Sequence, residues 1–157
     1  MFCLLIQIIS YSQNESTEQY CKGIEIFVRD SINNEFYYSK RSIPEILKKS
    51  IKKYFDSDFY IANPSKKYNK TDVIRNPILP NKQMLFLIQN QNKYALIYRR
   101  GGRCLQTYFI FAEIESSEVV LFKVFNINDS ICTVDDFLDQ VVSQKKYREN
   151  KENIKEF

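Results

Sequence analysis

The residues from Met84 to Ile127 contain four runs rich in aromatic and β-branched side chains. Short polar or glycine-containing segments at 90–92, 101–102 and 116–117 separate these runs. Short turns between such runs are typical of consecutive β-hairpins. The segments also leave no room for the crossover helix that a parallel pair of strands needs. The pattern therefore predicts a four-stranded antiparallel meander over residues 84–127.

The turns also give an expected register for the meander. If each turn is a two-residue loop, with Gly101-Gly102 as the second, Tyr94 lies opposite Phe109 and Phe111 opposite Phe122. The first face, expected to be the core, then carries Leu85, Leu87, Tyr94, Leu96, Tyr98, Leu105, Phe109, Phe111, Val120, Phe122 and Val124. The second face carries Phe86, Ile88, Ala95, Ile97, Tyr108, Ile110, Ala112, Ile114, Leu121 and Phe125. A slip of one residue in any turn would exchange these faces for the strands that follow.

Two helices are predicted to pack on this sheet, over residues 43–56 and 133–148. In the first, Ser42 is the expected N-cap, Pro44 lies near the first turn and Glu45 favours the positive end of the helix dipole. Its apolar stripe is Ile43, Ile46, Leu47, Ile51, Tyr54 and Phe55. In the second, Thr133 is the expected N-cap, and apolar residues recur from Val134 to Val142 at helical offsets.

The N-terminal part is expected to add a strand or hairpin to the sheet. Residues 24–30 alternate as a strand should, and residues 35–39 are a candidate hairpin partner. Residues 65–83 are polar and predict no element, which makes them an unusually long loop of the kind that is often functional. The fold class is therefore α+β. The order of strand, helix and meander is similar to cystatin-like folds, in which a curved sheet wraps a helix, and this analogy concerns the fold alone.

Residues 1–12 resemble a secretory signal peptide. Their apolar core is too short to span a bilayer, and Ser10 and Ser12 put small residues three and one positions before a cut at Gln13. The alternative is a buried N-terminal strand. The signal interpretation leaves residues 13–157 as one domain, with a charged tail at 146–157, and predicts a secreted or periplasmic protein. No other apolar run approaches the ~20 residues of a membrane helix.

Several classes of chemistry lack their usual residues. The chain has no histidine, no glycine-rich phosphate loop and no paired-cysteine spacing, so no metal site and no cofactor are predicted. An enzyme based on carboxylates or tyrosine stays open, with Glu113, Glu115, Asp135, Asp136 and Tyr108 as candidates. Scattered carboxylates more often mark a solvated surface, so the sequence favours a protein without catalytic activity.

Positive charge is concentrated between residues 40 and 75, which hold ten Lys and Arg against four acidic residues. The candidate anion-binding or polyanion-binding residues are Lys48, Lys49, Lys52, Lys53, Arg99, Arg100 and Arg103. Such clusters attract phosphates, anionic polysaccharides or acidic lipid headgroups. The alternative interpretation is an ordinary solvated helix face and hairpin turn. An exported location argues against nucleic acid as the partner.

The second sheet face offers a different candidate surface. Tyr108, Gln106, Lys123 and Phe125 are expected there together, where they could line a pocket, meet a partner or join two copies of the chain in a homo-oligomer. Export also permits disulfides, and the register brings Cys104 near Cys132, so these two are the candidate pair. The alternative is reduced, buried thiols.

These observations predict a small exported, non-catalytic binding or interaction module of the bacterial cell envelope or exterior. Its partner would be an unknown protein or envelope component. The alternative is a small-ligand carrier or enzyme that uses a pocket between the curved sheet and its helix.

Overall fold

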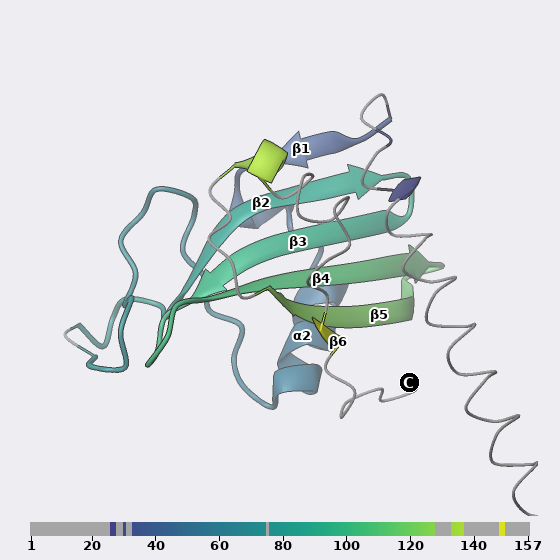
Figure 1. Cartoon of the computed structure of the whole chain (residues 1–157). Coiled ribbons are helices and arrows are strands. Elements are labelled where there is room, and N and C mark those ends of the chain that lie inside the picture. Colours follow the sequence, from purple (N-terminus) through teal and green to yellow (C-terminus); the bar gives the residue numbers. More distant parts are fainter. Residues whose placement is uncertain are drawn as a thin grey trace, which may run out of the picture.

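The computed structural model of the chain describes residues 26–27, 30, 33–74, 76–127, 133–136 and 148–149. Its elements are β1 (Glu35–Tyr37), the 3-10 helix η1 (Lys40–Ser42), α2 (Glu45–Phe55), β2 (Lys82–Asn90), β3 (Lys93–Arg100), β4 (Gln106–Glu115), β5 (Glu118–Ile127) and β6 (Arg148–Glu149). The strands form one antiparallel sheet in chain order, and α2 lies behind it in the view of Figure 1. The predicted α+β class with an antiparallel sheet is confirmed, and β1 and β6 extend the four-stranded meander on its two sides.

One face of the sheet packs against α2. Leu47 and Ile51 of the helix are buried, as is Ile43 just before it. They contact buried side chains from β2 to β5, namely Met84, Leu87, Leu96, Tyr98, Tyr108, Ile110, Ala112 and Val124. The predicted apolar stripe of the first helix therefore faces the core. We call this side of the sheet the helix face.

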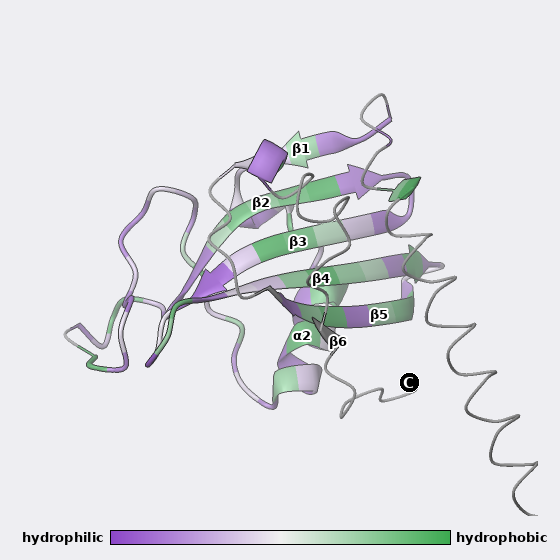
Figure 2. Ribbon diagram, viewed as in Figure 1, coloured by the Kyte–Doolittle hydropathy of each residue, from purple (hydrophilic) through white to green (hydrophobic). Residues whose placement is uncertain are grey.

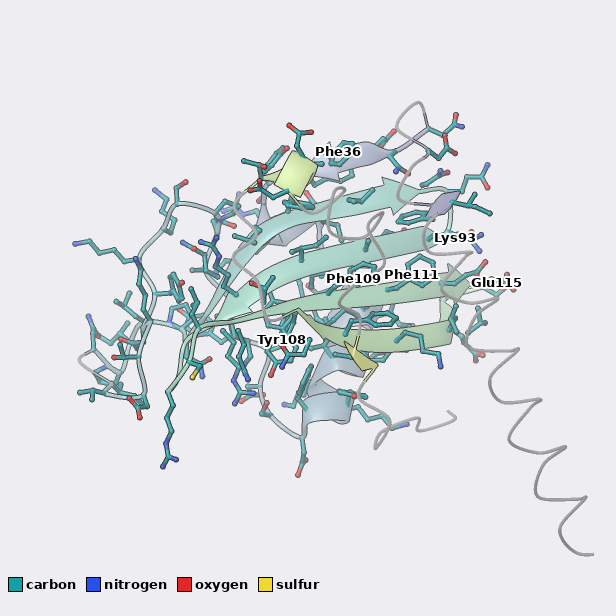
Figure 3. All side chains as sticks on the ribbon, in the orientation of Figure 1. Phe36, Lys93, Tyr108, Phe109, Phe111 and Glu115 are labelled. Atoms are coloured by element: carbon teal, nitrogen blue, oxygen red, sulfur yellow. The ribbon has the colours of Figure 1, made fainter. Side chains whose placement is uncertain are left out.

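The opposite face of the sheet is also apolar and buried. It carries Phe86, Ile88, Ala95, Ile97, Phe109, Phe111 and Phe125. Phe109 and Phe111 are labelled on this side of β4 in Figure 3. Among the described residues that cover it, Phe27 meets Phe111 edge-on with ring centroids 5.2 Å apart, and Val134 packs against the same cluster. We call this side the second face.

The predicted register between β3 and β4 is wrong. Gly101 and Gly102 do not form a two-residue turn, because β4 begins only at Gln106, which pairs with Arg100. The added residues shift the pairing by three, so β4 presents its other side to α2 and Tyr94 lies opposite Ala112. Tyr108, Ile110 and Ala112 therefore reach the helix face, where Phe109 and Phe111 were expected.

The loops on either side of this turn were predicted correctly, but each hairpin contains an irregularity. The register shifts between Met84 and Phe86 in β2, which leaves Leu85 without a cross-strand partner on β3. A second shift at 113–114 places Phe122 opposite Ala112 and leaves Val120 unpaired and exposed. This second shift returns β5 to the expected orientation, with Phe122 and Val124 on the helix face.

The first helix begins later than its expected cap. Ser42 ends η1, and the N-cap of α2 is Pro44, which makes no side-chain capping bond. Proline disfavours helical geometry in the residue before it, and Ile43 is accordingly extended, with ψ of 119°. Glu45 lies in the first turn as predicted, and Asp56 ends the helix in the left-handed conformation.

The predicted strand at 24–30 is wrong where the structure describes it. Ile26 and Phe27 are helical, and their carbonyls accept hydrogen bonds from the Asp30 amide at 3.1 and 3.3 Å. The partner of β1 is instead β2, with Phe36 opposite Ile88. The segment 24–30 is so short that its apolar residues fit the period of a helix as well as that of a strand. Phe27 is the residue of this segment that is buried in the core.

The second predicted helix is described only at its start. Val134–Asp136 is helical, and the Asp136 amide donates to Thr133 Oγ1 at 3.1 Å, so Thr133 caps the helix as predicted. Residues 137–147 of the predicted helix lie outside the described residues. Arg148 and Glu149, expected at the helix end and in the charged tail, instead pair with β5 as β6. In the described part of the chain, no helix is long and apolar enough to cross a membrane.

The long loop between α2 and β2 has a defined path. Ala62 bridges to β2, since its amide donates to the Lys82 carbonyl and its carbonyl accepts from the Met84 amide, both at 2.9 Å. Asn69 is buried, and its side-chain amide donates to the carbonyls of Asn76 and Leu79 at 2.8 and 2.9 Å. The loop is therefore held at two separate points, by backbone bonds at Ala62 and by the side chain of Asn69, although its sequence predicts no element.

Candidate anion-binding groove

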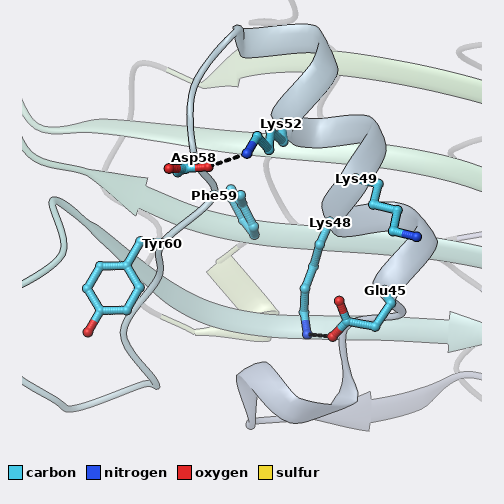
Figure 4. Close-up of a pocket in the computed structure, with 7 residues that line it drawn as sticks. All are labelled: Glu45, Lys48, Lys49, Lys52, Asp58, Phe59 and Tyr60. Carbon is cyan, nitrogen blue, oxygen red and sulfur yellow. Dashed lines mark hydrogen bonds and ion pairs between the residues drawn. The ribbon is translucent and has the colours of Figure 1, made fainter.

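A groove of about 470 Å³ lies between α2 and the chain that follows it. One wall is the helix, where residues 45, 48, 49 and 52 are spaced to lie on one side. The other wall is the segment 58–60 (Figure 4). Its lining is Glu45, Lys48, Lys49, Lys52, Asp58, Phe59 and Tyr60. We call this the α2 groove.

Two local features of the chain create the α2 groove. Asp56, with φ of 48°, reverses the chain at the end of the helix, so that the next residues run back alongside it. The bridge from Ala62 to Gln83 then fixes this returning segment to β2. Phe59 points toward the helix in Figure 4 and meets Tyr98 of the core edge-on at 5.6 Å. An anchored aromatic ring therefore forms the floor between the lysines and Tyr60.

Two of the groove lysines already have acidic partners. Lys48 Nζ lies 2.5 Å from Glu45, and Lys52 Nζ lies 2.6 Å from Asp58. The hydrogen bond and the charge of Asp58 raise the pKa of Lys52, and Lys52 lowers the pKa of Asp58 in turn. Lys52 and both carboxylates are exposed, Lys48 is half-buried, and ion pairs open to solvent in this way contribute little stability. They leave the lysines able to exchange partners with an incoming anion.

Lys49 differs from its neighbours. Its side chain is exposed, and it makes no ion pair with any residue in the described part of the chain. Its charge therefore makes the α2 groove positive, with three lysines against two carboxylates in the lining.

A second hollow of about 450 Å³ adjoins the α2 groove and shares Asp58 and Tyr60 with it. Lys82 of β2 and Arg100 of β3 line this hollow and lie opposite each other in the sheet. Burial lowers the pKa of Lys82, and the charge of Arg100 adds to this effect. Lys82 Nζ lies 5.9 Å from the Phe59 ring centroid and donates to the Asp58 carbonyl at 3.4 Å. The positive region thus continues past the groove.

The other predicted basic residues do not join this groove. Lys53 lies on α2 but does not line it. Arg99 lies on the second face, where it lines a different hollow with Asp135. Arg103 is exposed in the loop before β4. The seven candidates therefore divide between two sides of the sheet.

The four residues expected to share the second face are also separated. Tyr108 and Gln106 lie on the helix face, where the Tyr108 hydroxyl donates to Gln106 at 3.0 Å. Tyr108 is buried and stacks on Tyr98 with centroids 5.2 Å apart. Phe125 and Lys123 belong to the second face. The shifted register of β4 accounts for this separation.

The candidate catalytic residues do not form a cluster. Glu113 accepts from the Asn92 side chain at 3.1 Å at one end of β4, whereas Asp136 caps its own helix. Tyr108 faces α2, on the side of the sheet away from Arg99. No group of three His, Cys, Asp or Glu side chains suited to a metal ion occurs among the described residues.

Only one residue of the predicted disulfide, Cys104, lies in the described part of the chain. Cys104 lies in the loop before β4 and has an exposed thiol, so it is not a buried thiol. Cys132 lies outside the described residues. The pairing of Cys104 with Cys132 therefore stays a prediction.

Sequence reasoning found the lysines of the α2 groove but missed its other wall. Asp58, Phe59, Tyr60 and Lys82 were not candidates. The available signal was the short apolar segment 59–62 directly after a lysine-rich helix. The sequence does not show that this segment runs back alongside the helix, because that path depends on the chain reversal at Asp56.

Comparison of the chain with known protein families, curated proteins and solved structures finds no match. The function must therefore be inferred from the residues of this chain.

Proposed function

We propose that the protein is a small exported, non-catalytic binding module of the bacterial cell envelope or exterior, and that the α2 groove holds an anionic partner. The observation that carries this proposal is the placement of Lys48, Lys49 and Lys52 along one wall of a groove with an aromatic floor. Lysine ammonium groups attract sulfate, phosphate and carboxylate groups, and Phe59 and Tyr60 offer apolar surface to a sugar ring or chain. A polyanion of the envelope, such as an acidic polysaccharide, fits this combination.

The alternative of a pocket between the sheet and its helix has less support. The space beneath α2 is filled by side chains, and Leu47, Ile51 and Tyr98 are almost completely buried there. Filled interiors of this kind leave no volume for a ligand. The cystatin-like analogy is supported by the strand, helix and meander order, but it implies no activity.

The first test of the proposal is polyanion binding. Lys49→Glu is expected to weaken binding of a sulfated polysaccharide such as dextran sulfate about tenfold, because it removes one attraction and adds one repulsion. Exchanging both Lys48 and Lys52 for Glu is expected to abolish binding. The affinity should fall as salt rises, since exposed charges are screened. Titration calorimetry at two salt concentrations measures both effects.

The matched control is Lys53→Glu, which makes the same change in net charge on the same helix but outside the groove lining. Neutral dextran serves as the ligand control. If Lys53→Glu weakened binding as much as Lys49→Glu, net charge and not the α2 groove would be responsible. Binding that is insensitive to salt would also contradict the proposal.

Export is tested separately. We expect the mature chain to begin at Gln13, because the apolar run of residues 1–12 ends with the Ser10 and Ser12 spacing that signal peptidases require. Intact-mass analysis of the protein expressed in a bacterium with its full N-terminal sequence measures this. A mass that still includes Met1 or Phe2 would show that the segment is retained.

A further inference from the structure

Exposed aliphatic side chains gather at one end of the sheet. Val73, Ile74 and Ile78 are 65%, 66% and 78% exposed, and Leu105 is 49% exposed. The first three lie in the loop before β2 and the last in the loop between β3 and β4. Figure 2 shows hydrophobic segments on both loops at the same end of the molecule. Isolated exposed aliphatic residues are common, but a group of four at one end is not explained in that way.

The two loops are docked to each other as one unit. The amide of Gly101 donates to the Asn81 carbonyl at 2.8 Å, and that of Gly102 donates to the Lys70 carbonyl at 3.3 Å. Gly101 also packs directly on the backbone of Asn69 and Lys70, where a Cβ would lie 2.1 Å from the Asn69 carbonyl oxygen. The two loops therefore form one unit at this end of the sheet, and we call its exposed surface the loop end.

The internal bonds of the longer loop keep its aliphatic residues outside. Asn69 joins the two ends of the loop. Its backbone amide donates to the Pro80 carbonyl at 2.8 Å, and its side-chain amide donates to two further carbonyls. Asn76 Oδ1 accepts from the Ile78 amide at 3.0 Å. In this arrangement Pro80 is buried while Ile78 is the most exposed of the four. The internal hydrogen bonds of the loop therefore leave its aliphatic side chains exposed to solvent.

Basic residues lie close in the chain to the aliphatic residues of the loop end. Lys70 and Arg103 are exposed on the same two loops, and Arg100 is exposed at the adjoining end of β3. Asp72 is the acidic residue among the described positions of 70–81 and 100–105. Apolar side chains with a basic rim match an anionic membrane surface, where aliphatic groups enter the acyl boundary and Lys or Arg meet the headgroups. Two protruding loops with four aliphatic side chains offer little of the ~800 Å² per partner that a standard protein interface uses.

We propose that the loop end, consisting of Val73, Ile74, Ile78 and Leu105 with the basic Lys70, Arg100 and Arg103, docks the protein on an anionic lipid bilayer. None of these seven residues lines the α2 groove, although Ile74 and Arg100 line the hollow that adjoins it. The membrane proposal therefore does not depend on polyanion binding in the α2 groove. The protein would then bind its partner with one surface while the loop end holds it at a membrane.

The test is cosedimentation with phosphatidylcholine vesicles, with and without phosphatidylglycerol. The full chain is expected to bind the anionic vesicles and to bind the neutral ones much more weakly. Combining Ile74→Ser with Ile78→Ser is expected to weaken binding about tenfold or more, through the lost apolar contact. Arg103→Gln is expected to weaken it about fivefold. Val120→Ser is the matched control, because Val120 is also exposed but lies on β5.

A second measurement follows insertion directly. The chain contains no tryptophan, so Ile78→Trp gives a single reporter at the loop end, and Val120→Trp gives one on β5. The emission of the first variant is expected to shift to the blue with anionic vesicles, while that of the second stays unchanged. Circular dichroism checks that each variant is folded. The proposal is overturned if the folded protein does not bind anionic vesicles, if the serine variant binds like the wild type, or if the emission of Ile78→Trp does not shift.

Discussion

Replacing Gly101 with alanine is expected to lower the free energy of unfolding by about 3 kcal/mol, at the upper end of overpacking effects. The added Cβ would lie 2.1 Å from the Asn69 carbonyl oxygen and 2.7 Å from the Lys70 carbonyl carbon. Both are backbone atoms, which cannot rotate away as a side chain would. Either the β3–β4 loop or the longer loop must move. Such a movement would weaken the hydrogen bonds that the buried Asn69 side chain donates to the Asn76 and Leu79 carbonyls. Urea denaturation measures the change.

Gly102→Ala is the matched control. At this neighbouring position the nearest atom to an added Cβ is the Cys104 carbonyl oxygen at 3.9 Å, and neither glycine has a positive φ. We expect a change within about 0.5 kcal/mol. Equal effects of the two alanines would contradict the close contact between Gly101 and the longer loop.

Replacing Leu47 with alanine is the second change with a large expected effect. Leu47 is fully buried between α2 and the sheet, beside Ile51 and Tyr98. The substitution removes apolar contacts and leaves a cavity, and such changes cost about 2–5 kcal/mol. Urea denaturation of the full chain measures the loss.

Lys49→Ala serves as its control, because Lys49 is exposed on the same helix and its loss should change stability by no more than about 0.5 kcal/mol. If Leu47→Ala cost less than about 1 kcal/mol, α2 would not pack on the sheet in solution as it does here.

The strands and the first helix could be predicted because their apolar spacing matches what the fold buries. Residues 84–127 contain four strands of the length that the pattern indicates, and Leu47 and Ile51 lie on the side of the helix that their spacing predicts. Ser116 and Ser117 form the expected two-residue turn even though both have positive φ, which is uncommon without glycine or asparagine.

The register could not be predicted, because contacts distant in the sequence determine it. Gly101 and Gly102 suggested a tight turn, but their small size serves the approach of the loop that holds Asn69 and Lys70. The irregularities at 84–86 and 113–114 carry no glycine that would have marked them. Each changes the pairing by one residue, and one residue is enough to exchange the faces of a strand.

Only one wall of the candidate site could be predicted, because the other wall also depends on contacts distant in the sequence. The lysines of α2 are visible in the sequence, because a helix displays residues 48, 49 and 52 together. The wall opposite them depends on the reversal at Asp56 and on the bridge from Ala62 to β2. Asn69 begins a glycosylation-type triplet, yet its side chain is buried and bonded inside the loop, which the sequence alone does not reveal.

The most direct test of the proposed binding role is a titration of the isotope-labelled protein with a short sulfated oligosaccharide, followed by amide chemical shifts in NMR spectra. We predict that the largest shifts fall on residues 45–52 and 58–60, the two walls of the α2 groove. Shifts confined to the second face, or to the loops at 70–80 and 101–105, would contradict it, as would a spectrum that does not change.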